Sequence, residues 1–348
     1  MIIIGIDTSC DDTCIAVLEA RNKKIKILSN IISSQTNLHT KYGGVYPFLA
    51  KREHQKNLPI VLKKALKKAK NPKIDLIGIT VGPGLEPCLW TGVNFAKDLS
   101  DTLVKPLIPV NHIEAHILAN FVGKSQISNL KSQIFPAVCL VVSGGHTQLI
   151  LMRGIGKYKL IGETRDDAAG ECLDKVARIL GLGYPGGPVI AALAAMKLKV
   201  KNEKLKINLP RPMMYTKDYD FSFSGLKTAV LYKVQSEKRK IKSEKYIQEM
   251  CREVQQAVID VLIHKTLRAA KDYKVKSIIL GGGVAANDEL RKQLQERIKK
   301  EIPNTKYLIP DTKYCTDNAV MIAITALFNK KKATKNWKKI RVDANLKI

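Results

Sequence analysis

The stretch FPAVCLVVSGGHTQLILM, residues 135–152, consists of an apolar run, a short turn of small and polar residues, and a second apolar run. Residues 1–18, MIIIGIDTSCDDTCIAVL, follow the same design, with the polar turn at Ile6–Asp12. Two apolar runs joined by a tight polar turn predict a β-hairpin with one buried face. Because such a hairpin recurs at residue 135, we expect two similar halves that face each other across a nucleotide.

A third turn of small residues, LGGGVAAN at residues 280–287, follows the apolar run VKSIIL and precedes a helical pattern. Glycine in this turn and in SGGHT (residues 143–147) admits unusual φ values and lets backbone N–H groups converge on an anion. Glycine between a strand and a helix is typical of phosphate binding. Each turn alone is more typical of an ordinary connection, but the three in this order favour a two-lobed, ATPase-like cleft.

The composition is that of a globular protein without a membrane segment. A chain of 348 residues with 45% hydrophobic residues can form about two domains. No apolar run approaches the roughly 18 residues of a membrane span, and the N-terminal apolar stretch lacks the basic segment of a signal peptide. The seven cysteines form no C-x-x-C pair and lie mostly in apolar runs. This usage predicts reduced thiols in a cytoplasmic protein.

The formal net charge of +28 favours anionic partners. Such a field attracts phosphate backbones and steers nucleic acid to the surface. Lysine far outnumbers arginine, however, whereas selection for bidentate phosphate contacts favours arginine. The charge therefore permits an RNA partner and fits a lysine-biased proteome equally well. Lysine-rich stretches at 197–206, 238–245 and 330–339 predict solvated faces or loops.

Alternating strand and helix patterns predict an α/β sheet with crossover helices. We expect an N-terminal lobe over 1–134, with a C-terminal helix over 325–348 that packs back on it, and a C-terminal lobe over 135–324 with an insertion at about 163–223. The expected strands lie at 74–81, 106–110 and 275–280, and the expected helices at 51–70, 90–103, 246–272, from 112 and from about 317.

Two histidines in NHIEAH, His112 and His116, have the i, i+4 spacing that lets two imidazoles on one helix face share a metal. An isolated pair of this kind is more often two surface histidines. Glu114 lies two residues after His112, about 200° around a helix, and so points away from the metal face. A zinc peptidase needs the glutamate directly after the first histidine, as in H-E-x-x-H. The spacing therefore argues against a peptidase.

Asp317, in YCTDNA, is the best candidate for a third metal ligand. We expect it in the first turn of an apolar helix, where helix capping is the alternative role. A set of two histidines and one carboxylate leaves positions open for water or a phosphate oxygen and suits Fe(II), Zn or Mn.

Three further carboxylates are candidates for chemistry. Asp11 and Asp12 lie in the first polar turn, where they would repel a bound phosphate unless a metal or a proton transfer uses them. Asp174, in DDAAGECLDK, is a candidate acceptor for ribose hydroxyls. Exposed turn or helix positions are the ordinary alternative for all three.

The motifs taken together resemble one family. GIDTSCDDT, HTKYGGVYPFLAKREH, GPGL, NHIEAH, SGGHTQL, DDAAGECLDK, GYPGGP, FSFSGLKT, GGGVAAN and YCTDNA occur in the order found in the TsaD family, the bacterial tRNA N6-threonylcarbamoyladenosine transferases, formerly labelled O-sialoglycoprotein endopeptidases. The resemblance runs from about residue 2 to residue 330.

The resemblance implies an α/β, two-lobed actin/Hsp70-like ATPase fold, with duplicated βββαβα-type halves around a nucleotide cleft. It implies transfer of a threonylcarbamoyl group from threonylcarbamoyl-AMP to N6 of the adenosine beside the tRNA anticodon. It also implies a divalent metal, Fe(II) first and Zn second, and as partners tRNA, a TsaB-like paralogue and a TsaE-like P-loop ATPase.

The same resemblance assigns roles to individual residues. The metal ligands would be His112, His116 and Asp317, and the catalytic residue beside the reacting carbonyl would be Asp11. The residues around the adenylate would be Val141, Val142, Ser143, Gly144, Gly145, Asp174, Gly187 and Asn287.

Two other functions suit the same fold. A small-molecule kinase binds Mg²⁺ through water, carboxylates and phosphates and does not need paired histidines. A non-catalytic ATP-binding scaffold does not need the metal residues together with Asp11.

Overall fold

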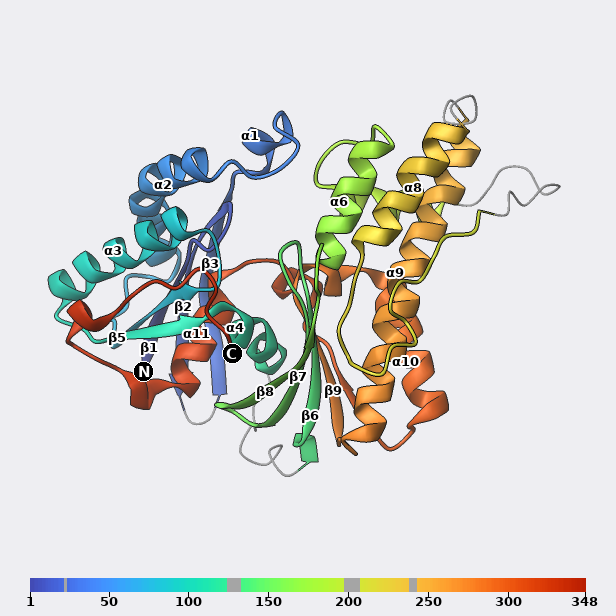
Figure 1. Ribbon diagram of the computed structural model, residues 1–348. Coiled ribbons are helices and arrows are strands. Elements are labelled where there is room, and N and C mark those ends of the chain that lie inside the picture. Colours follow the sequence, from blue (N-terminus) through green and yellow to red (C-terminus); the bar gives the residue numbers. More distant parts are fainter. Residues whose placement is uncertain (22–23, 124–132, 197–206, 238–242) are drawn as a thin grey trace. The chain divides into compact units, whose positions relative to one another are not determined.

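The first of two β-sheets is formed by the N-terminal part of the chain. The computed structural model describes residues 1–348 except 22–23, 124–132, 197–206 and 238–242. The strands of this sheet are β1 (Ile2–Asp7), β2 (Asp12–Arg21), β3 (Lys24–Ser34), β4 (Leu76–Gly82) and β5 (Leu107–Asn111), in the order β3-β2-β1-β4-β5 (Figure 1). Strand β2 is antiparallel to both β1 and β3, and β4 and β5 are parallel to β1.

The second sheet repeats this topology. Its strands are β6 (Ala137–Val142), β7 (Thr147–Gly154), β8 (Lys157–Glu163), β9 (Ser277–Gly281) and β10 (Lys306–Leu308), in the order β8-β7-β6-β9-β10. β6 is antiparallel to β7 and parallel to β9, as β1 is to β2 and β4. The two expected hairpins, the α/β class and the duplication are thus confirmed.

The chain divides into two units: the first contains the first sheet, and the second contains the second sheet except for the end of β7 and the start of β8. Unit 1 comprises Met1–Ile134, Gly154–Tyr158 and Pro310–Ile348, and unit 2 comprises Phe135–Arg153 and Lys159–Ile309. The structure therefore groups residues 310–324 with unit 1, although the sequence pattern predicts them in the C-terminal lobe. The reason is helix α11 (Ala319–Phe328), which packs against β1, β2 and β4.

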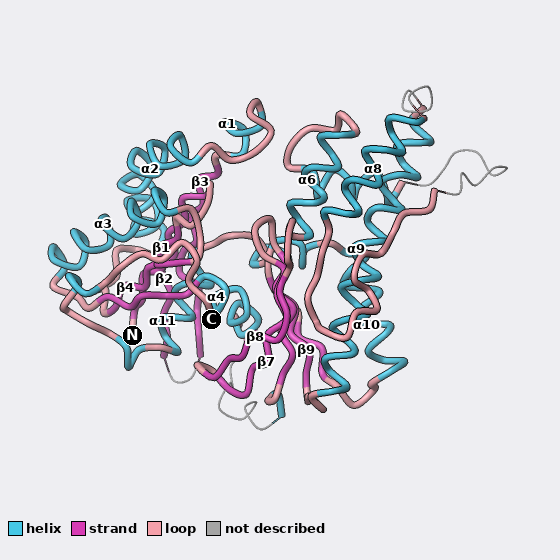
Figure 2. Tube along the Cα trace, viewed as in Figure 1, coloured by secondary structure: helices cyan, strands magenta, loops and turns pink. Residues whose placement is uncertain are grey.

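Helices cover both faces of the first sheet (Figure 2). Ile15 and Val17 of β2 face α2 (Pro47–Lys68) and α3 (Glu86–Leu103), whereas Cys14 and Ala16 face α11. Successive strand residues point to opposite faces, and here both faces are buried. This explains why the strand sequences read as continuous apolar runs. Unit 1 also contains the short helices α1 (Thr36–Thr40) and α4 (His112–Leu118).

The predicted C-terminal helix over 325–348 is wrong. α11 ends at Phe328, and short 3₁₀ turns follow at Lys330–Lys332 and Trp337–Lys339. Thr334 forms an antiparallel bridge with Leu107 of β5, and Ile340 is buried in the core of unit 1. The lysine-rich sequence of this segment has no continuous apolar face that a helix could bury. Pairing with β5 and burial of single apolar side chains hold the segment in place instead.

Unit 2 contains α6 (Ala169–Ile179), α7 (Gly186–Ala195), α8 (Ser224–Ser236), α9 (Glu244–Asp272) and α10 (Asp288–Glu301). The expected helix over 246–272 corresponds to α9. In unit 1, the helix expected over 51–70 begins earlier, at Pro47, because proline suits the first turn of a helix.

The three lysine-rich stretches have different outcomes. Residues 197–206 and most of 238–245 lie outside the described residues. The lysines of 330–339 are exposed, as expected.

All seven cysteines are free thiols. No helix in the described part of the chain is long and apolar enough to cross a lipid bilayer.

We expect Gly5→Ala to destabilise the protein, because α11 lies directly against the backbone of β1. A Cβ atom at Gly5 would lie 2.2 Å from the carbonyl oxygen of Ala319 and 2.7 Å from the amide nitrogen of Ala323. Overpacking of this kind costs about 1–3 kcal/mol or more. Urea unfolding should report this loss. Gly154→Ala is the matched control, because nothing lies within 4 Å of its added Cβ; equal stability of the two variants would contradict the close packing.

Candidate metal centre

Helix α4 begins directly at the end of strand β5. The side chain of Asn111, the last residue of β5, accepts hydrogen bonds from the backbone N–H groups of Ile113 (2.8 Å) and Glu114 (3.1 Å). This N-cap satisfies two of the free donors at the helix start. It fixes the first turn, so that His112 and His116 lie one turn apart on the same face.

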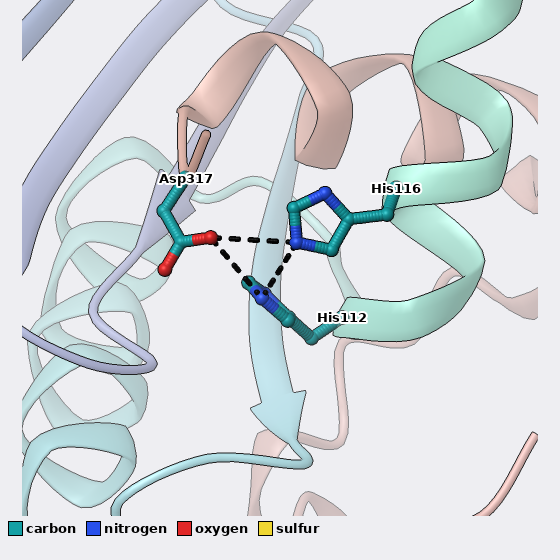
Figure 3. A group of neighbouring side chains, drawn as sticks. All are labelled: His112, His116 and Asp317. Atoms are coloured by element: carbon teal, nitrogen blue, oxygen red, sulfur yellow. Dashed lines mark hydrogen bonds and ion pairs between the residues drawn. The ribbon is translucent and has the colours of Figure 1, made fainter. Parts of the chain in front are cut away.

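The two imidazoles and the Asp317 carboxylate converge in unit 1 (Figure 3). His112 Nε2 lies 3.1 Å from His116 Nε2, and Asp317 Oδ1 lies 3.4 Å from each of these nitrogens. Both histidines are buried, and Asp317 is partly exposed. The structure thus brings together the three residues that the sequence singled out as ligands.

Asp317 reaches the histidines from outside helix α11. The expected position in the first helical turn is wrong, because α11 begins at Ala319 and Asn318 is its N-cap. The Asn318 side chain accepts the backbone N–H of Met321 at 3.2 Å. Since Asn318 caps the helix, the carboxylate of Asp317 is left to face the imidazoles.

The donor set fits a divalent transition metal. Two imidazole nitrogens and one carboxylate oxygen within 4.8 Å of one another are the ligands that Fe(II) and Zn use. The other ring nitrogens, Nδ1 of His112 and of His116, are buried and have no hydrogen bond among the described residues. Both Nε2 nitrogens face the cluster, so the two rings present the nitrogens that could bind an ion.

The electrostatics favour positive charge at this point. Burial by itself would lower the pKa of His112, but the carboxylates of Asp317 and Asp7 outweigh it and raise that pKa to about 10. Burial lowers the pKa of His116. Burial alone would raise the pKa of Asp317, yet the two imidazoles, His112 above all, bring it well below its usual range.

The turn between β1 and β2 carries the candidate catalytic residue. Asp11 is half-buried, and its backbone oxygen accepts the N–H of Gln35 at 3.1 Å. Burial raises the pKa of the neighbouring Asp12 to about 7, and the charge of Asp11 adds to this effect. Cys14, at the start of β2, contacts the backbone oxygen of Asp317 through its sulfur at 3.7 Å.

Glu114 points away from the metal ligands, as its helical position predicts. Its Oε1 accepts the Tyr158 hydroxyl at 3.0 Å, and its Oε2 accepts the Asn329 side-chain amide at 3.1 Å. Both partners belong to unit 1. The carboxylate therefore anchors α4 to its surroundings and is not placed to act as the base of a peptidase.

In unit 2, glycines bring the predicted phosphate-binding turns close together. A Cβ at Gly170 of α6 would lie 2.6 Å from the Ser143 backbone oxygen, and one at Gly282 would lie 2.3 Å from that of Val142. Gly282 has φ +90°, in the left-handed region that glycine tolerates. Gly144 and Gly145 do not have such φ values, so the prediction that φ selects glycine there is wrong. They are exposed with open space in front.

The other predicted nucleotide residues have local partners in unit 2. Asp174 Oδ1 accepts the backbone N–H of Gly186 at 2.7 Å and that of Gly187 at 3.3 Å. Burial raises the pKa of Asp174, and these hydrogen bonds partly oppose the effect. Asn287 caps α10 through Leu290 N and donates to Gln255 Oε1 at 2.7 Å. Val141 and Val142 are buried in β6.

Two buried side chains near the first turn were missed by sequence reasoning. Asp7, the last residue of β1, lies 3.4 Å from His112 Nδ1 through its Oδ2. His54 of α2 lies with Nε2 2.9 Å from the Cys10 carbonyl oxygen and Nδ1 2.8 Å from the Thr13 hydroxyl, so it holds both ends of the turn that carries Asp11. The one available signal was a charged residue at the end of a buried apolar strand, IIIGID.

The fold and the site define an α/β protein with duplicated actin/Hsp70-like units and a two-histidine, one-carboxylate centre in the first unit. A solved structure of full-length HypF in the phosphate- and nucleotide-bound form is similar in fold, with a TM-score of 0.56 at 13% identity, covering 94% of this chain and 55% of that one. HypF from T. kodakarensis also has a TM-score of 0.56, at 15% identity, covering 97% of this chain and 48% of that one.

Sequence comparison identifies the family. The model of the TsaD family, tRNA N6-adenosine threonylcarbamoyltransferase, matches residues 26–324. The enzyme of that name from Thermosipho africanus is 48% identical over 351 residues, covering 100% of both chains. The one from Thermosipho melanesiensis is 50% identical over 326 residues, covering 93% of each chain. The chain belongs to the TsaD family, and the family resemblance seen in the sequence is confirmed.

Proposed function

We propose that this protein transfers a threonylcarbamoyl group from threonylcarbamoyl-AMP to N6 of the adenosine beside the tRNA anticodon. Membership of the family supports the reaction class, and full-length similarity to the named enzymes supports the substrate. The observation that carries the proposal is the cluster of His112, His116 and Asp317. A kinase or an ATP-binding scaffold of the same fold does not require such a cluster.

The atoms that would hold the metal are His112 Nε2, His116 Nε2 and Asp317 Oδ1, with Fe(II) the first choice and Zn the second. A bound divalent ion supplies Lewis-acid stabilisation of negative charge on a phosphate oxygen. The protein supplies the donor set and a field, dominated by Asp317 and Asp7, that favours a cation.

The adenylate is proposed to bind at Val141–Gly145 with Asp174, Gly187 and Asn287. Gly144 and Gly145 support this role because they leave the backbone of the turn exposed, with open space in front. Backbone N–H groups in such a turn bind anionic oxygens. Asp174 holds the start of α7 through Gly186 and Gly187, which keeps the glycine backbone in place for a nucleoside.

In the reaction, the N6 amine of adenine attacks the carbamoyl carbon. A C–N bond forms, the bond from that carbon to the phosphate oxygen breaks, AMP departs, and the amine loses one proton. The amine is a weak nucleophile, so orientation and charge stabilisation supply most of the acceleration. Asp11 is the proposed acceptor of the proton, with water or the substrate phosphate as the alternative acceptors.

The proposed partners are tRNA, a TsaB-like paralogue and a TsaE-like P-loop ATPase. The net charge of +28 supports binding of a polyanion. The two protein partners follow from the family resemblance.

Nucleoside mass spectrometry tests the proposal directly. Depletion of this protein in its own cells should remove threonylcarbamoyladenosine from total tRNA and leave the unmodified adenosine in its place. Re-expression of the wild type should restore the modified nucleoside, whereas the double variant His112→Ala/His116→Ala should not. Unchanged amounts of the modified nucleoside after depletion would contradict the function.

A further inference from the structure

Asp7 and His112 approach each other through two atoms without hydrogen bonds. The Asp7 side chain is 1% exposed, and its Oδ1 accepts the backbone N–H of Ser9 at 3.1 Å. Its Oδ2 is buried and has no hydrogen bond in the described part of the chain. That oxygen lies 3.4 Å from His112 Nδ1, which is equally buried and equally without a hydrogen bond.

The two nitrogens of His112 face opposite partners. Nε2 faces His116 and Asp317 in the metal centre, whereas Nδ1 faces Asp7. A neutral imidazole carries one proton, and a nitrogen that binds a metal must offer its lone pair. Metal binding at Nε2 therefore requires the proton on Nδ1, directed at Asp7 Oδ2. The two unpaired atoms then form one charge-assisted hydrogen bond.

His116 lacks this support. Among the residues that the structure describes, its buried Nδ1 has no hydrogen bond. Its ring forms an ion pair with Asp317, through Nε2. One histidine of the pair thus has a carboxylate behind it and the other does not. A carboxylate on the outer nitrogen of a ligand fixes the ring orientation and the tautomer and increases ligand basicity.

We propose that Asp7 is a positioning residue of the metal centre, which holds His112 as the Nδ1–H tautomer and directs Nε2 toward the ion. This inference rests on the metal centre of the proposed function. It adds a residue outside the ligand set, placed there by the end of strand β1.

Competition with a chromophoric chelator measures Zn(II) affinity in the purified full-length protein. Asp7→Asn keeps the shape and the acceptor for Ser9 but removes the charge. It should weaken Zn(II) binding about 10- to 100-fold, the usual effect of losing such a partner. Asp7→Glu keeps a carboxylate and should recover most of this loss.

Two controls separate the contact from a general effect of charge. Glu114→Gln removes a buried carboxylate from the same helix as the ligands, where its partners are Tyr158 and Asn329. Asp12→Asn removes one at the start of β2, which forms no ion pair with either histidine among the described residues; all variants are compared at a pH well above the raised pKa of Asp12, so that this substitution also removes a charge. Both should bind Zn(II) within about threefold of wild type, because neither carboxylate faces a ring nitrogen of His112 or His116 in the described part of the chain, and Gln at position 114 keeps a polar side chain of the same size toward Tyr158 and Asn329.

A second measurement covers the case in which Asp7→Asn affects folding. The Zn(II)-induced rise in unfolding temperature, taken from each variant's own metal-free baseline, should be smaller for Asp7→Asn than for Asp12→Asn. Wild-type affinity in Asp7→Asn, or equal losses in Asp7→Asn and Asp12→Asn, would overturn the positioning role while leaving the metal centre intact. A wild type that binds no Zn(II) would overturn the metal centre and this inference together.

Discussion

Replacement of His112 or His116 by alanine should remove the metal from the purified protein. We expect about one divalent transition-metal ion per chain in the wild type and almost none in either variant. Each variant keeps two of the three protein ligands, and two ligands do not retain an ion that needs three. Threonylcarbamoyl transfer to tRNA should fall by at least about 100-fold, since in the proposed function the ion stabilises charge on the departing phosphate. Elemental analysis of protein prepared without chelators measures the first effect.

His264→Ala is the control for that experiment. His264 belongs to unit 2, where its ring packs edge-on against Tyr215 with centroids 5.2 Å apart. This variant should retain the metal and the activity. A wild type without metal, or a full complement of metal in both His112→Ala and His116→Ala, would show that the cluster is not a metal site.

Asp11→Asn should reduce the transfer rate by about 100- to 10,000-fold, the range for losing a group that accepts a proton in the transition state. The change keeps the size and hydrogen-bonding capacity of the side chain and removes its charge. Binding of adenine nucleotide should persist, because the proposed nucleotide residues are Val141–Gly145, Asp174, Gly187 and Asn287. Transfer of labelled threonylcarbamoyl to tRNA measures the rate, and equilibrium binding measures the nucleotide.

Glu114→Gln is the matched comparison for Asp11→Asn. Its side chain bonds to Tyr158 and Asn329 rather than to the metal ligands, so transfer should stay within a few-fold of wild type. Loss of transfer in Glu114→Gln together with normal transfer in Asp11→Asn would reverse our assignment of the reacting carboxylate. Metal-dependent peptide cleavage that depends on Glu114 would instead support a peptidase.

Much of the fold was predictable because its signals are local. The hairpins at residues 1–18 and 135–152 follow from two apolar runs and one turn, and the duplicated topology follows from their repetition. The pairing of His112 with His116 is likewise local, since the i, i+4 spacing places both rings on one helix face. The outward direction of Glu114 follows from the same geometry.

Other features depend on which segments pack together. Residues 325–348 were expected to form a helix, but a bridge to β5 and the burial of Ile340 decide their path. The start of α11 was expected about two residues too early, near Asp317 rather than at Ala319. Asn318, a residue type favoured at N-caps, was a local signal for the later start, whereas the path of residues 325–348 has no signal within a short window of sequence.

The sequence alone determined the α/β class, the two similar halves, the family and the three candidate metal ligands, because periodicity, turn chemistry and motif order are properties of short segments. Only the tertiary structure decided that Asp7 lies behind His112 and that Tyr158 and Asn329 hold Glu114. These contacts join residues far apart in the chain. The first of them exists because the parallel strands β1 and β5 lie on either side of β4, so that Asp7 and the start of α4 reach the same end of the sheet.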